Sequence, residues 1–149
     1  MKKLFLALTA LFITIGAKAQ IETHVTWAFA AKKISATEAV VLAKATIDPG
    51  WHIYSQTVKE GGPVKTEFTF TPSKDFTVTG KPSEPKPITK FEKVFNMNVG
   101  YFENAVIFQQ KVKLKSAKAT LVKGKVEFMT CNDSKCLPPD EVEFSVAIK

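Results

Sequence analysis

The chain has 149 residues and a formal net charge of +7, and all 21 of its basic residues are lysines. Bidentate recognition of phosphates and guanine edges favours arginine, so this composition argues against nucleic-acid binding. Three lysines precede residue 20, and the remaining 130 residues therefore carry a net charge of +4. That length is normal for one domain with its own hydrophobic core.

The first 19 residues have the pattern of a secretory signal peptide. Lys2 and Lys3 supply the positive start, residues 4–15 form the apolar stretch, and Ala17-Lys18-Ala19 is a small-residue cleavage site. We predict cleavage after Ala19, which gives an exported domain of residues 20–149. No cysteine lies directly after the apolar stretch, so no lipid anchor is expected. The alternative is an uncleaved N-terminal anchor.

From there on, apolar and polar residues alternate with the period of two that is typical of half-buried strands. Val25, Trp27 and Phe29, for example, share one face of an early strand. Further strands are expected at residues 40–47, 51–56, 68–71, 76–79, 105–115, 119–130 and 141–148. No segment has a capped helical stripe. Seven or eight short strands in one domain predict an all-β fold, an immunoglobulin-like β-sandwich.

The stretch from Gly80 to Gly100 departs from this alternation. It contains three prolines followed by two aromatic residues, Phe91 and Phe95. Long ordered loops on sandwiches are often functional, although a variable surface loop is the alternative. Because exposed aromatic side chains are costly in water, we expect Phe91 and Phe95 to cover something.

The only cysteines are Cys131 and Cys136, and an exported chain should join them in a disulfide. So short a loop stabilises a fold by only about 2 kcal/mol, which favours a bond that opens and closes over a structural staple. Strand alternation places Cys131 on the polar face with Met129, where another protein's thiol could reach it. Lys135 would favour a thiolate at Cys136. An inert disulfide remains the alternative from the residues alone.

Other chemistry has little support in the sequence. His24 and His52 are the only histidines, and His52, between Trp51 and Ile53, is interpreted as a packed or surface ring. No zinc spacing, phosphate loop or Ser-His-Asp order stands out. No cofactor or resident metal is expected. Met129 with Cys131 and Cys136 could form a soft-donor site for Cu(I), which is the main alternative of a different class. A purely structural binding sandwich is the other.

Two segments carry a resemblance to a known family. The sequence TCNDSKCLPP at residues 130–139 resembles the active-site hairpin of the N-terminal periplasmic domain of the thiol:disulfide interchange protein DsbD. The sequence DPGWHIYS at residues 48–55 resembles the turn and aromatic strand of the same domain. The order of segments also matches, and the similarity covers residues 21–149.

This resemblance implies a periplasmic thiol-disulfide oxidoreductase with an immunoglobulin-like fold. It would relay electrons between thioredoxin-like proteins through Cys131 and Cys136, with Cys136 forming the partner-linked mixed disulfide. Tyr54 matches an aromatic residue near the site, and Phe95 matches the phenylalanine of a cap loop that shields the cysteines. The residues at 93, 94 and 96 depart from the family pattern, and the cysteines are one residue closer together.

The family's full-length members continue into a membrane-embedded electron carrier and a thioredoxin-like domain. We therefore expect a free-standing relay module that draws electrons from a separate membrane carrier or thioredoxin-like protein.

Overall fold

The computed structural model describes residues 22–149, so the predicted signal peptide lies outside the described residues. This part of the chain contains eleven strands and no helix. No membrane-spanning helix is therefore found in it. The strands are β1 (Val25–Lys33), β2 (Glu38–Ile47), β3 (His52–Tyr54), β4 (Glu67–Phe70), β5 (Phe76–Val78), β6 (Ile88–Glu92), β7 (Met97–Glu103), β8 (Ala105–Leu114), β9 (Thr120–Phe128), β10 (Thr130–Cys131) and β11 (Asp140–Ile148).

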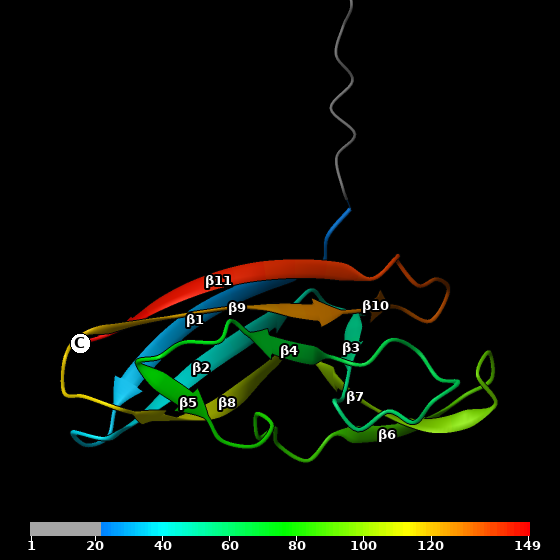
Figure 1. Ribbon diagram of the computed structural model, residues 1–149. Helices are drawn as coiled ribbons and strands as arrows, with labels where there is room; N and C mark the ends of the chain where they lie inside the picture. Colours follow the sequence, from blue (N-terminus) through cyan, green and yellow to red (C-terminus); the bar gives the residue numbers. More distant parts are fainter. Residues whose placement is uncertain (1–21) are drawn as a thin grey trace, which may run out of the picture.

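Two antiparallel sheets form the body of the molecule and confirm the all-β prediction. One has the strand order β1-β2-β8-β5 and the other β11-β9-β4 (Figure 1). Strict alternation of buried and exposed residues along β2 and β8 directs one face of the first sheet inward. Aromatic rings fill the space between the sheets, where Trp27 lies 5.4 Å from Phe128 and 6.0 Å from Phe108 between ring centroids.

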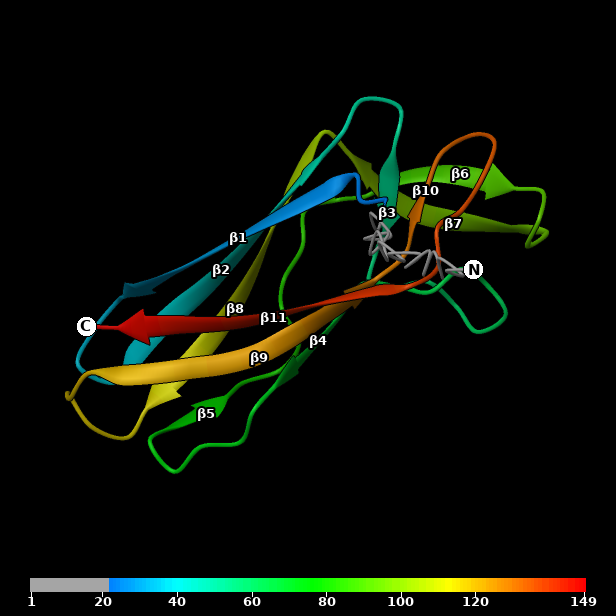
Figure 2. The same ribbon diagram turned by 90° about the horizontal axis from the view of Figure 1, so that it is seen from above.

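A third sheet, of order β10-β3-β7-β6, lies at the end of the molecule away from the C-terminus (Figure 2). Three of its strands continue strands of the two main sheets after a short interruption. β3 follows β2 across a turn in which Gly50 has φ = 82°, and β8 follows β7 after Asn104, which has φ = 62°. β10 follows β9 after the single residue Met129. This end sheet is therefore anchored directly to the core.

The prediction of a long loop between Gly80 and Gly100 was wrong. Residues 88–92 and 97–103 pair as the antiparallel hairpin β6–β7, and Ser83 forms a bridge with Gln109. The alternation was hidden because the partly buried face of β6 carries the charged residues Lys90 and Glu92, whereas the apolar Phe91 lies on the exposed face. The prolines do exclude a ladder before residue 88, since proline has no amide donor.

Candidate functional site

The cysteine hairpin connects β10 to β11 and is shaped by its own polar residues. The amide of Asn132 donates to the carbonyl of Lys135 at 2.9 Å, and the Asn132 side-chain oxygen accepts the amides of Ser134 and Lys135, both at 2.8 Å. The amide of Leu137 donates to the carbonyl of Thr130 at 2.9 Å. These bonds form a tight turn that brings its two ends together.

Cys131 and Cys136 face each other across this turn and form a disulfide, as predicted from their spacing. Their Cα atoms are 4.0 Å apart. The two sulfur-bearing residues differ sharply in environment: Cys131 is 1% exposed, whereas Cys136 is exposed. The disulfide therefore presents one cysteine to solvent and holds the other inside the protein.

The prediction that Cys131 would lie accessible on a polar face was wrong, although Cys131 does share its surroundings with Met129. Thr130 points toward the main core, and Cys131 points to the opposite face of the end sheet. That face is not open to water there. Cys131 clusters with Tyr54, Val99 and Tyr101. Partly buried hydrophobic residues pack against this cluster, namely Val58, Met97 and Met129.

One of these residues, Val58, comes from the segment between β3 and β4, residues 55–66, which we call the cover loop. Its ends are fixed: the Ser55 amide donates to the carbonyl of Gly100 at 2.9 Å, and the Thr66 hydroxyl donates to the carbonyl of Tyr54 at 2.6 Å. From within it, Val58 reaches the cluster around Cys131. The cover loop is thus part of the wall that shields the buried sulfur.

Histidine 52 also lies in this wall. Its ring is 4% exposed, and Nε2 lies 3.2 Å from the Tyr54 hydroxyl and 4.0 Å from a carboxylate oxygen of Glu92. Burial lowers the pKa of His52 below its usual value, while the charge of Glu92 acts in the opposite direction. Burial raises the pKa of the Tyr54 phenol well above its usual value. Of the two interpretations left open for His52, a packed or a surface ring, the structure shows the packed one, and sequence reasoning missed its pairing with Cys131.

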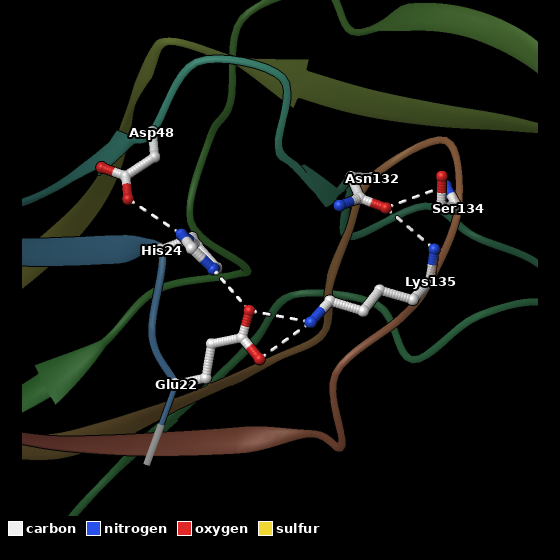
Figure 3. A network of polar contacts seen from close by, with 6 residues as sticks. All are labelled: Glu22, His24, Asp48, Asn132, Ser134 and Lys135. Atoms are coloured by element: carbon white, nitrogen blue, oxygen red, sulfur yellow. Dashed lines mark hydrogen bonds and ion pairs between the residues drawn. The ribbon is translucent and has the colours of Figure 1, made fainter. Parts of the chain in front are cut away.

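A polar network ties the start of the described chain to the cysteine hairpin (Figure 3). The ring nitrogens of His24 contact Asp48 at 2.9 Å and Glu22 at 3.0 Å, and Glu22 accepts two hydrogen bonds from Lys135 Nζ at 2.8 and 2.9 Å. The Lys135 bond is the main cause of a lowered pKa at Glu22, and the Glu22 bond is the main cause of a raised pKa at His24. The His24 ring stacks on Trp51 with a centroid distance of 3.9 Å.

Comparison with known proteins gives the family. Residues 18–148 match the family model described as "Thiol:disulfide interchange protein DsbD, N-terminal". The chain belongs to this family. A search of curated proteins finds no match.

Three solved structures share the fold at low sequence identity. The reduced DsbD N-terminal domain of Neisseria meningitidis is 18% identical, with a TM-score of 0.53 and coverage of 81% of this chain and 84% of that one. The complex between the DsbD N-terminal and PilB N-terminal domains of the same organism is 16% identical, with a TM-score of 0.54 and coverage of 81% of this chain and 80% of that one. The N-terminal periplasmic domain of ScsB from Proteus mirabilis is 22% identical, with a TM-score of 0.53 and coverage of 85% of this chain and 47% of that one. The chain thus spans about half of the ScsB domain.

The DsbD-type resemblance placed Tyr54 and Phe95 near the cysteines, but only Tyr54 belongs to the cluster around Cys131. Tyr54 is fully buried in the cluster with Cys131. Phe95 lies in the turn between β6 and β7, is partly buried, and does not belong to that cluster. Phe91 is 52% exposed, so the expectation that it covers something was wrong.

The β6–β7 hairpin nevertheless contacts the cysteine hairpin. Lys90 Nζ donates to a carboxylate oxygen of Asp133 at 2.9 Å and lies 3.8 Å from Glu92. This ion pair links the strand next to Phe95 with the turn that holds Cys136.

The residues available for a metal are few. Between residues 22 and 149, no group of three or more His, Cys, Asp or Glu side chains is arranged to hold a metal ion. In the copper alternative, Met129 would join two reduced cysteines, and the structure shows Met129 packed against the hydrophobic cluster around Cys131.

Proposed function

We propose that this protein is a periplasmic thiol-disulfide exchange module that relays electrons through a reversible Cys131–Cys136 disulfide. The observation that carries the proposal is the asymmetry of the pair: one exposed and one buried cysteine at the ends of a preformed turn. The greater exposure of Cys136 supports an attack by the partner thiolate at this residue, and therefore a role for Cys136 in the mixed disulfide. Family membership supports both the exchange activity and the periplasmic location.

The exchange balances as two thiol-disulfide substitutions. The thiolate of a reduced partner attacks Cys136 Sγ, a mixed disulfide forms, and Cys131 leaves as a thiolate that takes up a proton. A second partner thiol then attacks the partner's own sulfur and releases Cys136. In onward transfer, the Cys136 thiolate attacks the disulfide of an oxidised acceptor, and Cys131 closes the ring again. Two electrons pass in each cycle.

We infer that the partners are thioredoxin-like proteins, with a membrane electron carrier as the source of electrons. One of the similar structures is a complex of a DsbD N-terminal domain with another protein domain, which supports a protein partner for this surface. We also propose a mature protein that begins at Gln20 after signal cleavage. The intact mass of the chain purified from the periplasm tests that boundary.

The experiment that tests the relay compares two single variants. Cys131→Ser should trap a mixed disulfide through Cys136 with a thioredoxin-like protein, because the resolving thiol is gone. Cys136→Ser should give far less adduct, since Cys131 is buried. Non-reducing electrophoresis and mass spectrometry identify the adducts. Equal trapping by both variants, or trapping by neither, contradicts the proposal.

Two measurements separate the relay from its alternatives. A midpoint potential well below about −300 mV would indicate an inert structural disulfide. Tight binding of Cu(I) by the reduced protein, in the absence of any mixed disulfide, would favour the soft-donor site with Met129.

We propose further that Phe95 limits access to Cys136 as part of a cap, as the family resemblance suggests. Phe95→Ala should then speed reduction of the disulfide by a small thiol. Phe91→Ala is the matched control, because Phe91 lies in the same hairpin and is half exposed. Equal reduction kinetics in the wild type and Phe95→Ala, with unchanged circular dichroism, would contradict the proposal that Phe95 limits access to Cys136.

A further inference from the structure

The buried imidazole of His52 is paired with the buried cysteine of the disulfide. In the register of β3 and β10, Cys131 is the direct partner of His52. Directly opposed residues in an antiparallel pair project from the same face, with Cβ atoms about 4.5–5.5 Å apart. The opposite face carries Ile53 and Thr130. His52 and Cys131 are thus neighbours on the shielded side of the end sheet.

The Cys131 thiol must lose its proton to react, although it is shielded from water. A thiol shielded from water has a raised pKa, because burial disfavours the charged thiolate. The thiolate is nevertheless the species that must attack when Cys131 closes the ring. A base inside the wall would allow the attack at neutral pH without exposing the sulfur.

His52 has the properties of such a base. Burial keeps its ring neutral at neutral pH, and a neutral imidazole has one nitrogen that accepts a proton. The Tyr54 hydroxyl lies near Nε2, so it can hold the tautomer and leave Nδ1 for the second partner. Glu92 lies 4.0 Å from Nε2 and would stabilise the imidazolium once it forms. The titratable and charged groups around His52 are Tyr54, Lys90, Glu92, Tyr101, Glu103, Cys131 and Asp133.

We propose that His52 accepts the proton of the Cys131 thiol when Cys131 resolves the mixed disulfide, an inference that rests on the proposed exchange function. In this step the Cys131 S–H proton moves to His52, and the sulfur electron pair forms the bond to Cys136 Sγ. The bond between Cys136 Sγ and the partner sulfur breaks, and the partner leaves as a thiolate. The proton on His52 then passes to solvent or to the departing thiolate.

The test uses the reduced full-length mature protein and 5,5′-dithiobis(2-nitrobenzoate). Attack by Cys136 releases one nitrothiobenzoate, and resolution by Cys131 releases a second, so stopped-flow absorbance separates the two steps. In the wild type, the second rate should rise with pH through the His52 pKa and then level off. In His52→Gln, it should be about a hundredfold slower at neutral pH and rise with hydroxide, because general base catalysis is lost. The first rate should be unchanged.

Controls make the outcomes distinct. His24→Gln removes the only other histidine and should leave the rate and pH profile of the second step as in the wild type. Cys131→Ser should lack the second release. A His52→Gln protein with the wild-type second rate and pH profile overturns the proton role alone. A wild type that gives the first release but never the second overturns the exchange function itself.

A second variant keeps the proposal falsifiable if His52→Gln does not fold. The charge of Glu92 opposes the lowering of the His52 pKa, so Glu92→Gln should move the inflection of the second rate to lower pH. Glu103→Gln is a matched control on β7, since Glu103 acts in the same direction but ranks below Glu92. An inflection that stays in place in Glu92→Gln overturns the proposal.

Discussion

The cover loop offers a sharp test of whether local structure protects the buried sulfur. The perturbation is Thr66→Val, which keeps the shape of the side chain and removes its hydroxyl. Thr66 is fully buried, and its hydroxyl donates to the carbonyl of Tyr54 at 2.6 Å. The Tyr54 carbonyl keeps the Thr66 amide, at 3.4 Å, as a donor. Loss of one such hydrogen bond without an orphaned partner costs about 1 kcal/mol.

This cost has two measurable consequences. The melting temperature should fall by about 3–5 °C, as expected for a domain of this size. If the loop opens locally, its opening equilibrium should rise about fivefold, since 1 kcal/mol corresponds to that factor at room temperature. The assay is alkylation of Cys131 by iodoacetamide in a Cys136→Ser background, followed by mass spectrometry. Its rate should rise about fivefold in Thr66→Val.

The matched control is Ile148→Val. Ile148 is buried in a separate cluster with Leu114 and Val122, and loss of its methyl group also costs about 1 kcal/mol. It lowers global stability by a similar amount without touching the cover loop. If both variants speed alkylation equally, Cys131 becomes accessible by global unfolding. The argument that the cover loop protects it is then wrong.

Three further predictions follow from the electrostatics and packing. The NMR-determined pKa of His24 should lie above 6.5 and should fall in Glu22→Gln, which loses a hydrogen-bonded carboxylate. Because burial lowers the pKa of His52 in the folded protein, its contribution to stability is complete above pH 6.5 and is lost as the pH falls. The free energy of unfolding in urea should therefore fall less on acidification in His52→Gln than in the wild type. Gly124→Ala should lower the denaturation midpoint by the equivalent of about 1–3 kcal/mol, because a Cβ would lie 2.7 Å from the Phe144 ring and 2.6 Å from a backbone oxygen.

Local pattern predicted most of the sandwich. The strands β2, β8 and β11 were located to within two residues at each end, because their alternation is regular and each is bounded by turn residues. The disulfide was predicted because two cysteines flank turn-forming residues in an exported chain. These features depend on neighbours in sequence, so a single chain carries the signal.

The site depended on contacts that sequence does not show. Alternation placed Cys131 on the same face as Met129 but could not reveal that this face is covered by hydrophobic residues distant in sequence, Val58 of the cover loop among them. The pairing of His52 with Cys131 follows from the register of two short strands, which no local signal fixes. The β6–β7 hairpin was missed because β6 directs charged residues, Lys90 and Glu92, to its more buried face and leaves Phe91 exposed. In each case the error came from a tertiary contact overriding a local pattern.

The hydrogen bonds within the cysteine turn have a kinetic consequence. They do not involve sulfur, and the Asn132 side chain and the Leu137 amide can keep the turn closed when the S–S bond is broken. Two thiols held at the ends of such a turn meet at a high effective molarity, because closing the ring costs little orientational entropy. A covalent adduct on Cys136 would therefore be short-lived. Turnover would then be limited by how often partners meet the module, and weak, brief encounters would suffice.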